Sequence, residues 1–504
     1  LPFITGTICA HNCMTKCMRN YYDEPVNIRA TKLVAAEKGY DAYMAKITPP
    51  APVTDGRKVA VIGGGPTGMS AAYFVGRAGI PVTLFEKTDR LGGVVRQVIP
   101  AFRISDEAID KDVALMEKMG VEVKLNTEAP SVEELKAQGY THIFFAVGAW
   151  KAGRLDIPGN VVPVIGWLKD MKAGKDVSLG HVAVVGGGNT AMDAARAALR
   201  AGAKSSTLVY RRTKKYMPAD AEELEMAIAD GVEFLELVAP VEQKDGRLVC
   251  EKMKLGEPDE KGRRKPVPTG EMVEIPCDTV VSAVGERVES EVFTRNGITV
   301  DEKGIPAFKT NVEGVYAGGD AMRGPATVVE GIADAQYFAN AVIGEAHKFS
   351  IPAKAVATRE EAVAKKGVLC ESAKCEGDRC LTCNVVCQVC ADVCPNRANV
   401  VIELPDGRQQ ILHVDRMCNE CGNCAVFCPY DSAPYRDKFT LFLTREGFDE
   451  SVNNQGFLPL GGKKVLVRLD GKVLEADLDG KNDLPADVEV FIWTVLTKYA
   501  YLMG

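Results

Sequence analysis

Three stretches of the chain share one pattern: a short apolar run rich in β-branched residues, then glycines, then a segment with helical spacing. The runs span Lys58–Ile62, His181–Val185 and Gly314–Ala317. Short apolar strands that alternate with helices predict βαβ units with parallel sheets, that is, an α/β fold. The third run follows the second unit and resembles a closing strand of the first sheet. We therefore expect two nested domains, one inserted into the other.

The rest of the pattern divides the chain further. Prolines at 49, 50 and 52 separate an N-terminal helical region, and turn signals at Gly461-Gly462 and Asp470-Gly471 indicate a β-rich tail. The expected organisation is an N-terminal helical cysteine region, 1–50; a first nucleotide-binding domain in two parts, 51–165 and 289–346; a second, 166–288; a linker, 347–379; a cysteine-rich module, 380–436; and the tail, 437–504.

The composition argues against nucleic acid and membranes as partners but does not indicate an activity. The 504 residues are 46% hydrophobic and 26% charged, with a net charge of −7, which supplies no basic surface for nucleic acid. The apolar runs are too short to span a bilayer, and the N-terminus lacks the layout of a signal peptide, so we expect a cytoplasmic protein without a membrane partner. Because the chain starts at Leu1, processing and a missing upstream segment both stay open.

The first glycine-rich loop has the spacing of a dinucleotide-binding site. Gly63, Gly65 and Gly68 form G-x-G-x-x-G between a strand and a helix, which allows a tight turn, close approach of a pyrophosphate and close helix packing. Pro66 lies inside this loop. A second strand ends in Glu86, placed to accept hydrogen bonds from ribose hydroxyls, and Gly92 and Gly93 follow. A chance run of glycines would lack this context.

The second loop is the G-x-G-x-x-A variant and predicts a second Rossmann-like site. Its residues are Gly186, Gly188, Asn189, Thr190 and Ala191. At the end of the next strand stand two arginines, Arg211 and Arg212, in place of a carboxylate. Guanidinium groups bind a 2′-phosphate through bidentate bonds, which favours NADPH over NADH. The alternative is that both arginines are solvated surface residues beside Lys214 and Lys215.

An ordered set of motifs resembles the small subunit of glutamate synthase and its relatives over about residues 5 to 345. The motifs are GGGPTG, LGG, IPAFRI, AVGAW, GGGNTA, VYRRTKKYMPA and GVYAGGDAMRGPATVVEGIADA. The resemblance implies that the first site holds FAD, that Gly319 and Asp320 bind its ribityl and pyrophosphate portion, and that Thr327 lies beside the flavin ring. It also implies cofactor contacts at three further positions: Arg103, Gly148 and Gly285.

The C-terminal cysteines have the spacing of a ferredoxin with two 4Fe-4S clusters. Of 16 cysteines, eleven lie between positions 370 and 428, a density more typical of metal ligands than of disulfides in a protein without a secretion signal. One run comprises Cys418, Cys421, Cys424 and Cys428, followed by proline. The other comprises Cys383, Cys387, Cys390 and Cys394, also followed by proline.

The last cysteine of each such run binds the cluster of the other run. Cys394 is therefore expected with Cys418, Cys421 and Cys424, and Cys428 with the first run. The first run has one extra residue in its first gap, so its first ligand is either Cys383 or Cys380. A hairpin turning at residues 405–407 is expected between the runs. One alternative is a zinc site, but that would need only four ligands. The other is that the clusters only stabilise a small domain and carry no electrons.

Three N-terminal cysteines, Cys9, Cys13 and Cys17, recur every four residues. On one helix they would form a buried stripe. The resemblance gives the other interpretation, because family members carry such a trio in a region that binds two 4Fe-4S clusters with further upstream cysteines. A Glu or Gln ligand of the family aligns with Lys32, and an ammonium group is a poor ligand. Cys370, Cys375 and Cys380 are either free or ligands of a further cluster.

The combination of this core with a two-cluster module closely resembles iron-sulfur flavoproteins named as selenate reductase subunits. It implies an NAD(P)H oxidoreductase subunit that moves electrons between NADPH, FAD and 4Fe-4S clusters, to or from a partner subunit or a ferredoxin within a larger complex. Two alternatives remain: an electron-bifurcating subunit, and a scaffold that binds cofactors without turnover. Hydride transfer between cofactors needs no catalytic acid or base, so no catalytic residue is assigned.

Overall fold

The computed structural model describes ten segments of the chain: 1–15, 17–21, 24–177, 179–258, 264–344, 375–380, 387–428, 432–451, 454–480 and 482–504. Contacts within the chain define two compact units, which are described separately. Unit 1 comprises Leu1–His11 with Arg29–Phe349, and unit 2 comprises Asn12–Ile28 with Ser350–Gly504. In the described segments, every helix is too short or too polar to span a bilayer.

The first sheet of unit 1 is fully parallel, as the apolar runs predict, with the order β15-β4-β1-β2-β3. Strand β15 follows the second domain in sequence and pairs with β4 from before it, so the chain returns to the first sheet. The strands are β1 (Val59–Ile62), β2 (Val82–Phe85), β3 (Glu122–Lys124), β4 (His142–Phe145) and β15 (Val315–Ala317).

Helices cover both faces of this sheet because neighbouring residues of β1 point to opposite sides. Val59 and Val61 pack in the same core cluster as residues of α4 and α13, whereas Ala60 packs with α7 and α11. Helix α6 packs on α4, and short helices α5 and α12 lie in loops. The bounds are α4 (Pro66–Arg77), α5 (Gly93–Gln97), α6 (Asp106–Glu117), α7 (Val132–Ala137), α11 (Glu291–Thr294), α12 (Asp320–Arg323) and α13 (Val328–Ile343).

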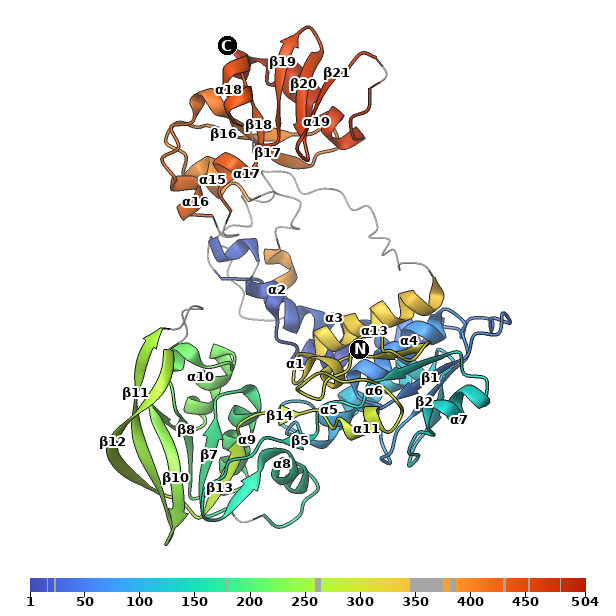
Figure 1. Cartoon of the computed structure of the whole chain (residues 1–504), viewed down its shortest axis with the longest axis vertical. Helices are drawn as coiled ribbons and strands as arrows, with labels where there is room; N and C mark the ends of the chain where they lie inside the picture. Colours follow the sequence, from blue (N-terminus) through green and yellow to red (C-terminus); the bar gives the residue numbers. More distant parts are fainter. Residues whose placement is uncertain are drawn as a thin grey trace. The chain divides into compact units, whose positions relative to one another are not determined.

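The second sheet is also parallel and carries helices on one face and a small antiparallel sheet on the other (Figure 1). Its order is β6-β13-β7-β8-β9. The strands are β6 (Val161–Pro163), β7 (His181–Gly186), β8 (Ser205–Tyr210), β9 (Glu233–Glu236) and β13 (Thr279–Ala283). The helices are α8 (Val164–Lys172), α9 (Asn189–Arg200) and α10 (Ala221–Ala229). The antiparallel sheet comprises β10 (Val238–Lys244), β11 (Arg247–Pro258) and β12 (Arg264–Pro276).

A two-stranded ribbon lies where the chain passes between the two sheets. Strand β5 (Lys151–Ala152) leads out of the first domain, and β14 (Glu286–Arg287) leads back, paired antiparallel to β5. Two N-terminal helices complete unit 1: α1 (Pro2–Ile8), and α3 (Ile28–Lys46). Asp112 of α6 accepts hydrogen bonds from the main-chain N–H groups of Phe3 and Ile4, at 3.2 and 2.7 Å, and so holds the first turn of α1.

Unit 2 contains one mixed sheet of six strands in the order β16-β17-β18-β19-β20-β21. The predicted hairpin is confirmed, because β16 and β17 pair antiparallel around residues 404–408. The strands are β16 (Asn399–Glu403), β17 (Gln409–Val414), β18 (Phe439–Leu441), β19 (Gly456–Gly461), β20 (Lys464–Leu469) and β21 (Lys472–Asp477). The helices are α2 (Asn12–Thr15), α15 (Val389–Asp392), α16 (Asn423–Val426), α17 (Pro434–Asp437), α18 (Arg445–Glu450) and α19 (Ala486–Lys498), with short 3-10 turns η1 (Met18–Tyr21), η3 (Glu376–Arg379), η4 (Asp415–Met417) and η5 (Ala500–Met503).

The tail is therefore not a separate appendage, because strands from both sides of the expected boundary at 436 share this sheet. Strand β18 pairs parallel to both β17 and β19. Ile402 and Leu412 of the hairpin pack in one core with Phe457 and with Phe491 of α19. An isolated two-stranded hairpin is marginal in water, and the tail supplies the apolar surface that the hairpin buries.

Candidate functional site

Two glycines of the first loop are required by the packing of the protein itself. Gly63, directly after β1, has a φ of 104°, and a Cβ there would lie 2.5 Å from the carbonyl oxygen of Ala146. A Cβ on Gly68 would collide with the carbonyl oxygen of Gly63, since the first turn of α4 packs on the end of the strand. Glycine at both positions therefore allows the tight turn and the close helix.

Gly65 in the same loop has open space where a side chain would begin. A Cβ there would meet only the Cα of Gly93, at 3.9 Å, and Gly65 lines a cavity of about 470 Å³. It is also the N-cap residue of α4, with Pro66 following it, so the unpaired N–H groups of the first turn lie at this space. A bare helix N-terminus beside a cavity suits the pyrophosphate of a dinucleotide.

Glu86 is buried at the end of β2 and lines the same cavity. Its Oε2 accepts a hydrogen bond from the N–H of Gly64 at 2.7 Å, and its Oε1 accepts from the N–H and the hydroxyl of Thr88 at 2.9 and 2.7 Å. A carboxylate offers about four acceptor positions, so capacity remains for one more donor. The side chain is thus held in place where a ribose hydroxyl could donate to it.

Gly92 and Gly93 lie beneath the first loop. The N–H of Gly92 donates to the carbonyl of Gly64 at 2.8 Å, and both residues have positive φ, 116° and 53°. A Cβ on Gly93 would lie 2.8 Å from the Cα of Gly65. Gly92 and Gly93 therefore pack directly against Gly65, which borders the cavity. We call each glycine loop, together with the helix N-terminus that follows it, a cradle.

Gly319, Asp320 and Thr327 lie together at the start of α12 and α13. The N–H of Gly319 donates to Oδ2 of Asp334 at 2.9 Å. Burial raises the pKa of Asp320 to about 6, although its Oδ1 accepts a hydrogen bond from the N–H of Ala326 at 3.1 Å. Thr327 caps α13, with its Oγ1 accepting from the N–H of Glu330 at 3.3 Å. Asp320 and Thr327 both line the cavity.

Glu286 is a cavity residue that the sequence analysis missed. It lines the cavity with Gly148 and Thr190, forms a side-chain hydrogen bond with Thr190, and has a pKa raised by burial. A repeat could have revealed it: Ala-Val-Gly follows β4 at 146–148 and again closes β13 at 283–285. Gly148 and Gly285 occupy matching places and have φ values of 76° and 108°. Glu286 is the residue after the second copy.

The second loop repeats the geometry of the first. A Cβ on Gly186 would collide with the carbonyl oxygen of Ala283, whereas a Cβ on Gly188, the N-cap residue of α9, would meet nothing within 4 Å. Ala191 is fully buried against the core. The side-chain amide of Asn189 donates to Asp220 at 3.2 Å and accepts from its N–H at 3.0 Å. The open space again lies at a helix N-terminus.

The two arginines follow β8 directly. Arg211 is exposed and Arg212 is half-buried. The Nε atom of Arg212 is buried and has no hydrogen-bond partner, although the side chain of Arg212 also hydrogen-bonds Tyr210. A buried guanidinium nitrogen without an acceptor is costly, but it has almost no surface that a ligand could reach, so Arg211 is the arginine open to a bound phosphate. The residues therefore fit a nucleotide that carries a 2′-phosphate.

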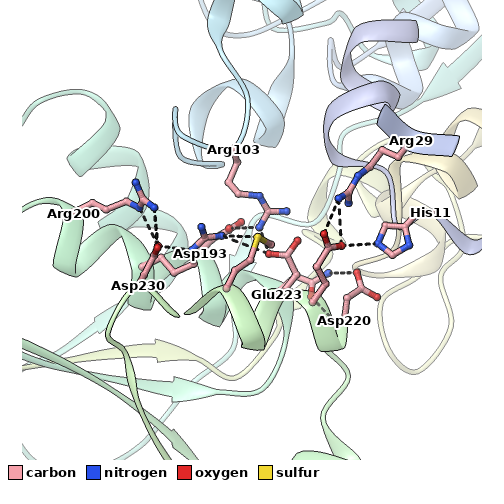
Figure 2. Close-up of polar contacts among 12 residues, drawn as sticks. His11, Arg29, Arg103, Asp193, Arg200, Asp220, Glu223 and Asp230 are labelled. Carbon is pink, nitrogen blue, oxygen red and sulfur yellow. Dashed lines mark hydrogen bonds and ion pairs between the residues drawn. The ribbon is translucent and has the colours of Figure 1, made fainter. Parts of the chain in front are cut away.

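Arg103, expected at the cofactor, lines the cavity but directs its guanidinium to the second domain (Figure 2). Its Nη1 donates to Oδ1 of Asp193 at 2.7 Å and to Oε2 of Glu223. Neither acidic residue was singled out from the sequence, because each lies inside an ordinary amphipathic helix. Burial, with repulsion from Glu223, raises the pKa of Asp193 to about 6, against the lowering effect of Arg103 and Arg196.

In unit 2, the last cysteine of the first run lies among the first three cysteines of the second run. One small cavity is lined by Cys394, Cys418, Cys421 and Cys424. Main-chain N–H groups point to two of the sulfurs, from Ala398 to Cys394 at 3.2 Å and from Glu420 to Cys418 at 3.3 Å. Such bonds stabilise thiolates, the form that binds metal.

The thiols also influence one another across the two runs. The pKa of Cys390 is raised to about 11, mainly by burial and also by Cys387, Cys424 and Cys428, against the lowering effect of Lys438. Cys428 likewise raises the pKa of Cys387, after the larger effect of burial. Buried thiols so close together ionise only with a compensating positive charge. Thiols are the ligand type of iron-sulfur clusters, but within the described segments no three His, Cys, Asp or Glu side chains are arranged to hold a metal ion.

The N-terminal trio does not form one helical stripe. Helix α1 ends before Cys9, which is extended with a ψ of 150°, and only Cys13 lies within α2. Cys9 belongs to unit 1, is buried and lies 3.6 Å from Nζ of Lys32, whereas Cys13 and Cys17 belong to unit 2. Cys380 is half-buried, and Cys383 and Cys370 lie outside the described residues. Cys375 forms a disulfide, unlike the metal ligand or free thiol that we expected.

Both glycine loops lie in a part of the chain that matches a known protein family. Residues 57–335 match the family described as pyridine nucleotide-disulphide oxidoreductase. YgfK of Escherichia coli (strain K12) is 41% identical over the whole chain. The beta subunit of NADP(+)-dependent formate dehydrogenase from Moorella thermoacetica is 36% identical over 66% of the chain. The small chain of glutamate synthase [NADPH] from E. coli (strain K12) is 30% identical over 68% of the chain.

The chain is shorter than most of these relatives. It spans 52% of the length of YgfK, 53% of the formate dehydrogenase subunit and 80% of the glutamate synthase small chain. About half of each of the two longer relatives therefore has no counterpart in the 504 residues.

Proposed function

Because the chain belongs to the pyridine nucleotide-disulphide oxidoreductase family, we propose that it is an electron-transfer subunit that binds FAD in its first site and NADPH in its second. The single observation that supports this most strongly is the pair of open glycines. Gly65 and Gly188 each cap a helix beside space that no protein atom fills, whereas neighbouring glycines in both loops are required by packing. Two such cradles in one unit are suited to two dinucleotides.

The residues of the first site have separate tasks in this proposal. The N-terminus of α4 holds the pyrophosphate, Glu86 accepts from a ribose hydroxyl, and Asp320 binds the ribityl and pyrophosphate portion. The capped N-terminus of α13 at Thr327 stabilises negative charge beside the ring. When bound, a flavin takes up hydride from reduced nicotinamide and releases electrons singly. The chain has to align the two rings and exclude water, so no acid or base side chain is required.

At the second site Arg211 and Arg212 select NADPH. The exposed side chain of Arg211, next to the half-buried Arg212, is the observation that favours a phosphate over a free hydroxyl at this position. Asn189 and Thr190, in the first turn of α9, border the cavity that also holds the first glycine loop. A nucleotide on α9 would therefore reach toward the flavin site along one continuous cavity.

The cysteines of unit 2 hold two 4Fe-4S clusters in this proposal. One is bound by Cys394 with Cys418, Cys421 and Cys424, and the other by Cys428 with Cys387, Cys390 and either Cys383 or Cys380. Clusters are needed only if single electrons leave the flavin, so we expect a partner subunit or a ferredoxin as the exchange partner. Two relatives support this, since one is named as a beta subunit and another as a small chain.

The experiment is anaerobic purification of the full chain, followed by titration with NADPH. We expect flavin absorbance on a broad iron-sulfur background, about eight irons in the C-terminal unit, and rapid bleaching of the flavin. A protein that binds FAD but is not bleached by NADPH would be a cofactor-binding scaffold, and the proposal would fail. Fewer than four irons per chain after careful reconstitution would remove the clusters from the proposal but leave the nucleotide sites.

A further inference from the structure

The segment from Gly93 to Arg103 joins the first glycine loop to the second domain. It begins at Gly93, pressed against Gly65, and ends at Arg103, whose ion pairs lie on α9 and α10. Several of its residues line the cavity: Gly93, Val94, Val95, Gln97, Val98, Ile99 and Arg103. We call residues 93–103 the brace.

Apolar contacts fix the first half of the brace on the second domain. Val98 is buried in the same core cluster as Val182 and Leu208 of the second sheet, and Val94 packs against that cluster. The ammonium of Lys172, in α8, donates to the carbonyl of Ile99 at 2.6 Å. Although the brace lies within the first domain in sequence, Val94 and Val98 therefore complete the core of the second.

Charged contacts fix the other end. Arg103 is 15% exposed, and its partners Asp193 and Glu223 are 10% and 4% exposed, so this ion pair is largely shielded from solvent. The ring of Phe102 lies beneath Arg196 and Arg200, with guanidinium carbons 5.0 and 4.6 Å from the ring centre. Figure 2 shows Arg103 descending from its own segment toward the helices of the second domain.

The acidic residues that Arg103 pairs with are also held by their own domain. Nε of Arg196 donates to Asp230 at 2.8 Å, and Nη1 of Arg196 lies 3.9 Å from Glu223. Arg200 also donates to Asp230. The partners of Arg103 are therefore presented rigidly by two helices. The long side chains of this network are held in one arrangement by their mutual bonds. The guanidinium of Arg103 can join them in only one geometry, so it fixes the position of the brace relative to α9 and α10.

The covalent connection between the domains cannot define that position alone. The chain passes between them through the ribbon of β5 and β14, and each strand of this ribbon contains only two residues. A second set of contacts outside the brace comes from the N-terminal region, since His11, which follows α1, and Arg29 of α3 bind Glu222 of α10 at 3.0 and 3.1 Å. These contacts are more exposed, so they are screened by solvent more than the Arg103 pair.

We propose that Arg103 is a positioning residue, which holds α9 and α10 against the flavin cavity so that nicotinamide and flavin meet in a reactive geometry. This inference rests on the proposed function and deepens it. The guanidinium of Arg103 binds Asp193 and Glu223, so we infer that it acts through α9, whose first turn carries Asn189 and Thr190. Since misplacement by about 1 Å can lower a rate by about a hundredfold, loss of this pair should slow hydride transfer more than it weakens binding.

The test compares Arg103→Gln, Arg103→Lys and a matched control, Arg247→Gln, in the full-length anaerobic protein. Arg247 pairs with Glu274 within the antiparallel sheet and lines neither cradle. Stopped-flow spectroscopy measures the maximal rate of flavin reduction by NADPH and the NADPH concentration that gives half of it. Reduction by dithionite, which needs no nicotinamide alignment, gives the reference rate.

We expect Arg103→Gln to lower the maximal rate by at least about tenfold, with FAD content, half-saturating NADPH and dithionite reduction each within about twofold of the wild type. Arg103→Lys should recover part of the rate, and Arg247→Gln should match the wild type. If Arg103→Gln does not fold, Glu223→Gln removes one of the two carboxylate partners of Arg103 and should lower the maximal rate in the same way but by less, because Asp193 remains.

Two results would overturn the inference while the proposed function stands. One is a variant that NADPH reduces at the wild-type rate. The other is a variant that loses FAD, which would make Arg103 a flavin-binding residue. If NADPH fails to bleach the wild type itself, the proposed function fails first, so the two failures are distinguishable.

Discussion

The main-chain N–H of Gly64 donates a 2.7 Å hydrogen bond to Oε2 of Glu86, so the carboxylate at the end of β2 is fixed by the same loop that borders the cavity. In a Glu86→Gln variant the neutral amide loses the charge-assisted bonds to Gly64 and to a ribose hydroxyl. At about 1.5 to 3 kcal/mol per bond, FAD affinity should fall by about tenfold or more.

Equilibrium titration of the apoprotein with FAD measures this loss. Glu122→Gln is the matched control, because Glu122 accepts from Thr83 at 2.8 Å on the same sheet and does not border the cavity. Unchanged FAD affinity in the Glu86 variant would show that the carboxylate only caps its own loop.

The arginines after β8 should determine nucleotide preference. Replacing Arg211 and Arg212 with alanine removes the donors expected at the 2′-phosphate, so NADPH affinity should fall by at least about tenfold while NADH affinity is spared. Binding of both nucleotides can be followed by quenching of flavin fluorescence, with Lys175→Ala as a surface control. A double variant that still prefers NADPH to the same degree would place both side chains in solvent.

Ligand exchange between the two cysteine runs predicts which cluster each substitution damages. Cys394→Ser should perturb the cluster held by Cys418, Cys421 and Cys424, since these four residues line one cavity. Cys428→Ser should instead perturb the cluster near Cys387. Electron paramagnetic resonance of the reduced protein, with iron analysis, distinguishes the two, and the opposite assignment would refute the exchange.

The clusters of unit 2 should carry electrons to the partner. In a Cys390→Ser, Cys421→Ser protein that retains FAD, flavin reduction by NADPH should persist, while reduction of a copurified partner should collapse. The reason is that a flavin exchanges hydride unaided but needs a one-electron path to a separate protein. If partner reduction continues at its original rate, the clusters are structural and electrons leave elsewhere.

Asp193 should make the stability of unit 1 depend on pH. Its pKa is about 6 in the folded protein, above the usual 3.8, so the folded state binds its proton more tightly than the unfolded state does. The free energy of unfolding should therefore fall as pH rises from about 4 to 6, by about 3 kcal/mol from this group. The charged groups that face it are Arg103, Arg196 and Glu223.

Denaturant unfolding of the wild type and of Asp193→Asn at pH 4 and pH 7 measures this contribution. The variant should lose that part of the pH dependence while keeping the rest. Equal slopes in both proteins would mean that the arginines compensate the buried carboxylate fully.

The spacing of residues that are close in sequence was enough to predict both glycine loops and the C-terminal cysteine runs. A turn after a strand has to satisfy steric limits within a few residues, so Gly63, Gly68 and Gly186 can be identified from their neighbours in sequence. The exchange of Cys394 and Cys428 is predicted in the same way from the proline-terminated runs. Parallel sheets follow from apolar runs that alternate with helices, and the structure confirms them.

Tertiary structure alone decided the rest. The pairing of Arg103 with Asp193 and Glu223 depends on which helices face it across 90 and 120 residues of sequence. The mixed sheet continues past residue 436 because the β16–β17 hairpin buries its apolar side chains against the tail. Cys9 and Cys13 do not share a helix because α1 ends at Ile8. Such contacts depend on burial and charge pairing across the whole fold, so they cannot be predicted from residues that are close in sequence.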